Sequence, residues 1–110
     1  MRFTVSQSSL AKALSVVSKG IASHSTIPVL GGILMRASNG TLEMQTSDLD
    51  TSIRHKIAAN VEEEGETVIS GRMLSNVVKN LQDAAVTFDG GEGTINVTCD
   101  KSSFHLNTLN

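Results

Sequence analysis

Two helical stretches of this sequence carry basic side chains that are suited to binding phosphate. Lys12 and Lys19 lie roughly two helical turns apart in one stretch, and Arg72 and Lys79 have the same spacing in the other. This spacing puts both cations of each pair on one face of their helix, opposite the apolar residues. Lys and Arg bind phosphate oxygens, so the pattern indicates contact with a nucleic-acid backbone. The same pattern is also typical of a solvated helix face, and the sequence by itself leaves that alternative open.

Acidic residues are absent from both stretches. The chain has eleven Asp and Glu residues and a formal net charge of -2, and every acid falls in a predicted strand or loop. A negative net charge argues against nucleic-acid binding, but this distribution leaves a positive surface if the two helices lie side by side. We therefore predict contacts with double-stranded DNA for Lys12, Lys19, Arg72 and Lys79. Four phosphate contacts correspond to a log-log salt slope of about -3.6, so one such domain is expected to bind duplex weakly.

The sequence contains no group of His and Cys residues with the spacing of a metal site. The three histidines are scattered, at His24, His55 and His105, and Cys99 is the single cysteine. A structural zinc site needs ligands at closer spacing. Cys99 alternates with apolar residues in a predicted strand, so we expect a buried and unreactive thiol. We predict no metal and no cofactor.

Catalytic motifs are missing as well. Asp48 and Asp50 are the one notable carboxylate pair, and Asp at such positions usually bonds the backbone amides of a turn. The glycines around Glu92 are not followed by the Lys-Ser or Lys-Thr of a phosphate-binding loop, so 89–93 is expected to be a hairpin connection. No nucleophile elbow occurs, and we predict no catalytic residue.

Length and composition are those of one folded domain. The chain has 110 residues, of which 39% are hydrophobic and 18% are charged. It contains no apolar run long enough to cross a bilayer and no signal-peptide core, so the expected location is the cytoplasm, with no membrane partner. Three Phe residues and no Trp or Tyr make stacking on single-stranded nucleic acid an unsuitable mode of binding.

The helices are predicted from apolar residues at helical spacing. In the first, the stripe is formed by Leu10, Leu14, Val17 and Ile21. It follows the capping residues Ser6 and Ser8, and Gly20 is expected to end the helix or to weaken its last turn. In the second, Ser70 is the expected N-cap, and the stripe is formed by Leu74, Val77, Val78 and Leu81.

Alternating apolar residues predict short strands around the two helices. They are centred on 3–5, 33–37, 42–46, 53–57, 67–69, 86–88, 95–97 and 104–106. Asn39-Gly40 is a strong hairpin signal between two of them, and the acidic run 62–66 is expected to be a solvated loop. The order strand, helix, three strands occurs twice. We predict an α+β fold in which this unit is duplicated and both helices pack on one side of antiparallel sheet.

Five segments, in order along the chain, resemble the start of bacterial sliding clamps, the DNA polymerase III beta subunit family. One of them has the pattern Pro-x-Leu-x-x-x-Leu from Pro28 to Leu34. The five segments are 1–5, 27–34, 39–42, 46–50 and 104–109. The similarity covers essentially the whole chain.

The resemblance implies a DNA-clamp fold, with 1–110 as the N-terminal domain of a three-domain chain. Two such chains would join head to tail as a homodimer, forming a ring whose helices line the central hole. The implied role is that of a DNA replication processivity factor, a non-catalytic subunit that encircles duplex DNA and tethers the replicative polymerase. DNA polymerase III and the clamp loader are the implied protein partners, and their binding pocket is expected outside this domain.

The resemblance also implies residue roles. Lys12, Arg72 and Lys79 match basic positions of the family's helices, and His24 matches a position on a DNA-facing loop.

A strand near the end of the chain resembles the family's first-domain contribution to the subunit interface. It contains Phe104 and Leu106, and Lys101 would add a charge contact. The alternative is that Phe104 and Leu106 are core residues. Two other hypotheses remain open for the whole chain, a stand-alone interaction module of the same fold and an unrecognised hydrolase.

Overall fold

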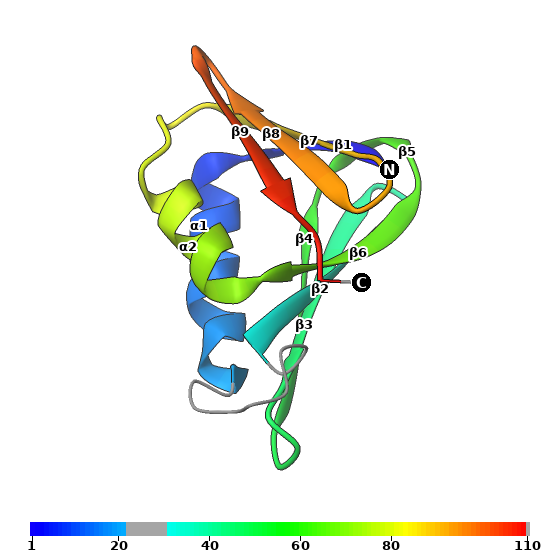
Figure 1. Ribbon diagram of the computed structural model, residues 1–110, viewed down its shortest axis with the longest axis vertical. Helices are drawn as coiled ribbons and strands as arrows, with labels where there is room; N and C mark the ends of the chain where they lie inside the picture. Colours follow the sequence, from blue (N-terminus) through cyan, green and yellow to red (C-terminus); the bar gives the residue numbers. More distant parts are fainter. Residues whose placement is uncertain (22–30, 110) are drawn as a thin grey trace.

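The computed structural model describes residues 1–21 and 31–109. Within these ranges, two helices lie together on one side of the molecule and the strands form two antiparallel sheets (Figure 1). In chain order the elements are β1 (Arg2–Ser6), α1 (Gln7–Val17), a 3-10 turn η1 (Ser18–Gly20), β2 (Gly32–Ser38), β3 (Thr41–Ser47), β4 (Ser52–Ala58), β5 (Asn60–Glu63), β6 (Gly65–Ser70), α2 (Gly71–Lys79), β7 (Ala85–Gly90), β8 (Thr94–Cys99) and β9 (Ser102–Asn107). The predicted α+β fold and its duplicated unit of a strand, a helix and three strands are confirmed.

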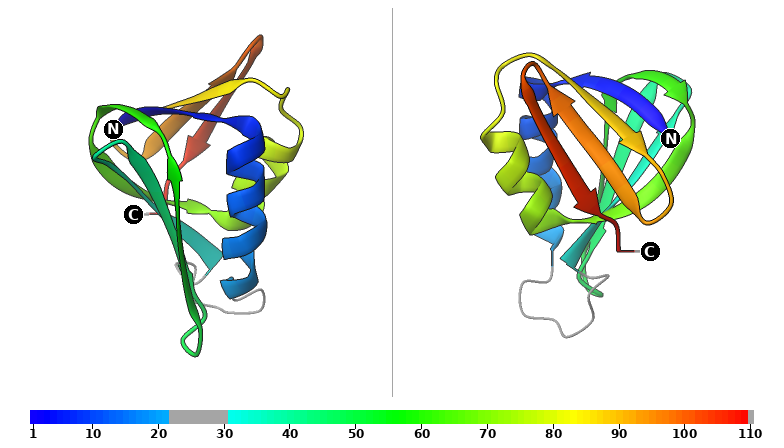
Figure 2. Two further views of the ribbon diagram at one scale, coloured as in Figure 1. Left: turned by 180° about the vertical axis from the view of Figure 1, so that it is seen from behind. Right: turned by 45° about the horizontal axis from the view of Figure 1, so that its top comes forward.

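The sheets exchange strands between the two halves of the chain. One sheet has the order β5-β1-β7-β8-β9, and the other has the order β4-β3-β2-β6. Strand β1 of the first half therefore pairs with β7 of the second, and β6 of the second half pairs with β2 of the first. Figure 2 shows from two further sides that both helices cover the same side of these sheets.

The acidic run 62–66 is not the loop that the sequence predicted. Its first residues belong to β5, which pairs with β1, and Gly65 and Glu66 begin β6. The Glu63 carboxylate forms an ion pair with the α-amino group of Met1, which lowers the pKa of Glu63. Charged side chains point to solvent on these strands, so charge density alone was a poor guide to backbone pairing here.

Each helix begins directly at the end of a strand. The Ser6 hydroxyl accepts a hydrogen bond from the Ser9 N–H at 3.2 Å, and the Ser70 hydroxyl accepts one from the Met73 N–H at 3.3 Å. These are the N-caps that the sequence predicted for the second helix and allowed for the first. Because Ser6 ends β1 and Ser70 ends β6, the two exchanged strands determine where both helices start.

The inner faces of the helices pack on the sheets with the predicted apolar stripes. Leu10, Leu14 and Val17 of α1 are buried, as are Leu74 and Val78 of α2. Two buried rings join the exchanged strand β1 to its neighbour β7, because Phe3 of β1 stacks on Phe88 of β7 with centroids 4.8 Å apart. Cys99 is 1% exposed, which confirms the buried thiol.

A buried hydroxyl fastens the end of α1 to the sheet beneath it. Thr46 is 2% exposed, and its hydroxyl donates a hydrogen bond to the carbonyl of Val17, the last residue of α1. Gly20 follows at a point where no side chain fits, since a Cβ there would lie 2.5 Å from the Thr46 Oγ1. The approach of α1 to β3 thus requires a small residue at 20 and a donor at 46.

The predicted turns are present. Asn39 and Gly40 both have positive φ, at 50° and 74°, which is the two-residue hairpin geometry that Asn-Gly favours. The Asp48 carboxylate accepts hydrogen bonds from the Asp50 and Thr51 N–H groups, as expected for a turn. Gly91 N–H donates to the Thr94 carbonyl in the connection between β7 and β8.

Replacing Thr46 tests the contact between α1 and β3. Thr46→Val keeps the shape of the side chain but removes the buried donor, and it is expected to lower the free energy of unfolding by about 1–3 kcal/mol in urea titrations. Thr46→Ser keeps the donor and is expected to cost less. The control is Thr98→Val on the exposed face of β8, and an equal loss in this control and in Thr46→Val would contradict the role of the hydrogen bond.

Candidate nucleic-acid interface

The two helices form a continuous surface. Residues Ala11, Leu14, Ser15 and Ser18 on the α1 side face Ser75, Val78 and Lys79 of α2 across a shallow groove of about 180 Å³. The helices are also joined directly, because the Gln7 side-chain amide donates to the Val78 carbonyl at 3.0 Å. The sequence did not predict this contact, because glutamine is common on exposed helix faces and nothing near Gln7 in the chain points to α2. The sequence prediction that both helices share one side is confirmed.

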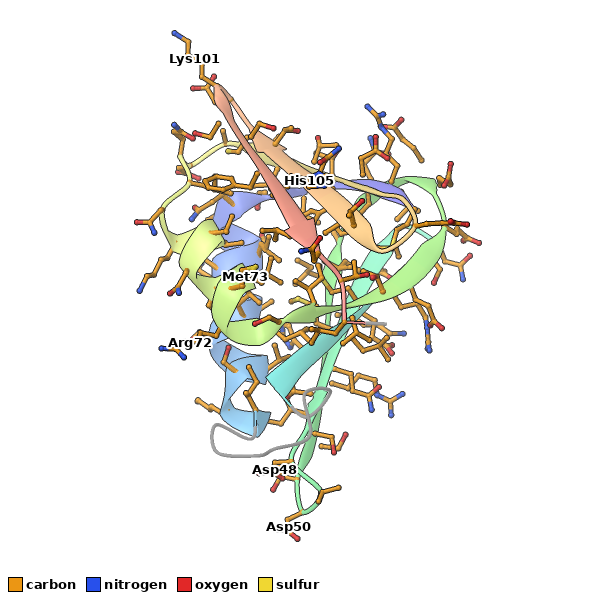
Figure 3. The ribbon with its side chains drawn as sticks, in the orientation of Figure 1. Asp48, Asp50, Arg72, Met73, Lys101 and His105 are labelled. Atoms are coloured by element: carbon orange, nitrogen blue, oxygen red, sulfur yellow. The ribbon has the colours of Figure 1, made fainter. Side chains whose placement is uncertain are left out.

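Four predicted DNA-contacting cations are exposed and free of ion pairs within the described residues. Lys12, Arg72 and Lys79 lie on α1 and α2, whereas Lys19 lies in η1, just after α1 ends. Neither α1 nor α2 contains an acid. Figure 3 shows the Arg72 side chain directed away from the body of the molecule. The helical surface therefore carries unneutralised positive charges among hydroxyl and amide groups, which suits phosphate oxygens.

Cations on the sheets are placed differently. The Arg36 Nε lies 2.9 Å from the Glu66 carboxylate, and its Nη1 lies 3.7 Å from that of Glu43, which Lys56 also approaches at 3.6 Å. On the other sheet, the Arg2 guanidinium reaches both Glu62 and Asp89, at 3.3 and 3.4 Å. Arg2, Arg36 and Lys56 are thus paired with acids on neighbouring strands. Arg54 of β4 and the helical cations form no ion pair with the described residues.

His24 lies outside the described residues. The structure therefore describes four of the five residues predicted to contact DNA, and the DNA contacts of all five stay predictions.

A second, apolar surface lies where α2 meets the edge strand β9. It is a groove of about 430 Å³ that we call the α2–β9 groove, lined by Ser70, Arg72, Met73, Asn76, Val77, Asn80 and Phe104. Phe104 is half-buried in its wall, and Met73 is 45% exposed. Arg72 thus lies at the edge of both the helical surface and the α2–β9 groove. Helical spacing alone did not predict its place in the groove.

The three predicted interface residues lie in different settings. Phe104 lines the α2–β9 groove, while Leu106 is 7% exposed and belongs to the core. Lys101 is exposed in the turn before β9. Of the two apolar residues, Phe104 is therefore the one with a surface to offer a partner.

In the part of the chain that the structure describes, no three His, Cys, Asp or Glu side chains gather closely enough to hold a metal ion. Neither described helix has the length and apolar character needed to cross a membrane.

The arrangement of two helices against two strand-exchanged sheets is that of the clamp fold. It superimposes on Caulobacter crescentus pol III beta with a TM-score of 0.95 and 28% identity, covering 100% of this chain and 30% of that chain. The Helicobacter pylori beta clamp bound to a DNA ligase peptide has the same fold, with a TM-score of 0.95 at 21% identity, over 100% of this chain and 31% of that one. The class is therefore an α+β clamp domain.

The sequence assigns the family within that class. The model of the DNA polymerase III beta subunit, N-terminal domain, matches residues 1–110. The chain belongs to this family. A beta sliding clamp of Micrococcus luteus is 37% identical over 109 residues, and so is the beta sliding clamp homolog GriR of Streptomyces muensis. These matches cover 99% of this chain but 35% and 29% of the two relatives, so the chain spans about a third of their length.

Neutralising single cations tests the contrast between the two surfaces. Lys79→Gln removes an unpaired charge and is expected to change the free energy of unfolding by no more than about 0.5 kcal/mol. Arg36→Gln breaks contacts with Glu43 and Glu66 and is expected to lower it by about 0.5–1 kcal/mol at low salt. Both are measured by urea unfolding at low and high salt. A clear, salt-sensitive loss in Lys79→Gln would mean that the helical cations serve stability.

Proposed function

We propose that this chain is the first domain of a ring-shaped replication clamp whose complete form encircles duplex DNA and tethers the replicative polymerase. The observation that carries the proposal is the acid-free helical surface, with its unpaired Lys12, Lys19, Arg72 and Lys79, on a chain of net charge -2. Membership of the DNA polymerase III beta subunit family supports it. The proposed location is the cytoplasm.

The mechanism follows from weak, long-range attraction. A few phosphate contacts per domain hold a duplex loosely, because each contributes only about 0.9 to the log-log salt slope. Hydroxyl and amide side chains between the cations can also bind phosphate oxygens, but contacts with the phosphate backbone do not distinguish one DNA sequence from another. Persistence on DNA would then come from enclosure, and a tethered polymerase would stay near its template through high effective concentration. The proposed role is non-catalytic.

The α2–β9 groove is the proposed joint between subunits. Phe104 and Met73 offer apolar contact area, and β9 is an edge strand whose outer backbone groups are free to pair. A head-to-tail homodimer would cover this groove with a different surface of the partner, since a heterologous joint pairs unlike patches. Leu106 would support the joint from the core, and Lys101 would lie at its rim. The pocket for DNA polymerase III and the clamp loader is proposed to lie on other domains.

Enclosure is tested with the complete gene product. It is loaded by its clamp loader with ATP onto nicked circular plasmid, and half of the sample is linearised before gel filtration. The expected result is retention on circles and release from linear ends, because a closed ring can leave only over an end. Equal retention on both forms would indicate ordinary surface binding and contradict the ring.

Charge reversal tests the helical surface in the same complete protein. Lys12→Glu with Lys79→Glu avoids the doubly placed Arg72, and each lost contact is expected to reduce the log-log salt slope of duplex binding by about 0.9. The control, Arg54→Glu, reverses an exposed charge on β4 and is expected to leave binding nearly unchanged. Fluorescence anisotropy with labelled duplex measures both. Equal losses in the variant and the control would show that net charge matters and the helical surface does not.

A further inference from the structure

Each helical stretch carries a serine set between two cations. The serine follows one cation by three residues and precedes the other by four, a spacing that brings all three side chains to one helix face. The two sets are Lys12, Ser15 and Lys19, and Arg72, Ser75 and Lys79. The chain therefore repeats one arrangement of cation, hydroxyl and cation in both of its halves.

Ser15 and Ser75 line the two walls of the groove between α1 and α2, which we call the interhelical groove. Ser15 is exposed and Ser75 is half-buried. Neither side chain forms a hydrogen bond with the described residues, although a serine inside a helix often bonds a carbonyl one turn back. Both hydroxyls are therefore available to a ligand.

The rest of the groove suits an anion. Lys79 lines it, and none of its described lining residues is an acid. Leu14 and Val78 lie at its base, since they are 4% and 1% exposed. An apolar base beside hydroxyl and ammonium groups strengthens a hydrogen bond to an anion, because the local dielectric constant is lower there than in water. The interhelical groove thus offers hydrogen-bond donors to an oxyanion and no negative charge to repel it.

The two walls of the groove are fixed relative to each other. The Gln7 amide donates to the Val78 carbonyl at 3.0 Å, and this hydrogen bond joins the start of α1 to the end of α2. The N-caps Ser6 and Ser70 hold the first turn of each helix at the end of a strand. Figure 1 shows the two helices side by side. A groove that is formed before the ligand arrives lowers the entropy cost of binding.

We propose that one strand of the DNA backbone binds along the interhelical groove, with the Ser15 and Ser75 hydroxyls donating hydrogen bonds to its phosphate oxygens beside Lys79. The inference deepens the proposed function, on which it rests. The cations of the helical surface attract a duplex from a distance, and the hydroxyls add directional contacts that set where the phosphates lie. Contacts with phosphate carry no sequence information, so they suit a clamp that must bind any duplex.

Ser15→Ala combined with Ser75→Ala tests the proposal in the complete gene product. This variant loses both hydroxyls and keeps every charge. Its duplex binding, measured by fluorescence anisotropy over a series of salt concentrations, is expected to be about three- to tenfold weaker at each concentration. The log-log salt slope is expected to stay unchanged, because neutral donors release no counterions. Alanine is the stronger helix former, so the variant is expected to unfold at an equal or higher urea concentration.

Three further variants separate the hydroxyls from the charges. Ser9→Ala removes an exposed hydroxyl of α1 that does not line the groove, and it is expected to leave duplex binding unchanged. Ser15→Thr keeps the hydroxyl and is expected to bind nearly as well as the wild type. Lys79→Gln removes a charge, so it is expected to reduce the magnitude of the salt slope by about 0.9 as well as the affinity.

Wild-type affinity in the double alanine variant would overturn the proposal, and so would an equal loss in Ser9→Ala. A changed salt slope in the double alanine variant would also overturn it, because the hydroxyls would then act through the cations. Failure here is separable from failure of the ring. A complete gene product that is retained on circular DNA, with duplex binding indifferent to both serines, would refute the role of the groove alone, whereas loss of retention in the wild type would refute the proposed function.

Discussion

The exchange of β1 and β6 between the two halves of the chain is the constraint on which the rest of the structure depends. Each helix begins at the last residue of an exchanged strand, at Ser6 for α1 and at Ser70 for α2. Pairing β1 with β7 and β6 with β2 therefore places both helices on one side of both sheets, with the start of α1 at Gln7 beside the end of α2 at Val78. The stacked rings of Phe3 and Phe88 stabilise this arrangement in the core.

The same arrangement separates the charges. Cross-strand neighbours let sheet cations such as Arg36 bind acids, whereas acid-free helices leave Lys12 and Lys79 without such neighbours in the described chain. Exposed ion pairs contribute little to stability, so the domain loses little by leaving the helical cations unpaired. An anionic polymer on the helical side would therefore meet positive charges that form no ion pair with the described residues.

The proposed joint between chains uses other features, the edge strand β9 and the α2–β9 groove. Among the described strands, β9 lies at the edge of its sheet, and Phe104 and Met73 leave apolar area open beside it. Arg72 stands between this groove and the helical surface. The proposed DNA contact and the proposed chain joint are thereby neighbours on α2, and substitutions at Arg72 are expected to affect both.

Local features of the sequence determined the helix stripes, the caps, the Asn39-Gly40 hairpin, the Asp48 turn and the absence of acids from the helices, because each depends on residues within a few positions of one another. The tertiary structure alone decided that the strands divide into two strand-exchanged sheets, that the acidic run supplies β5, and that Leu106 is core while Phe104 lines a groove. These outcomes depend on partners distant in the chain, such as Arg2 opposite Glu63 and Asp89. Alternating apolar residues predict a strand but do not indicate the strand with which it pairs. Packing against the rest of the molecule determines that pairing.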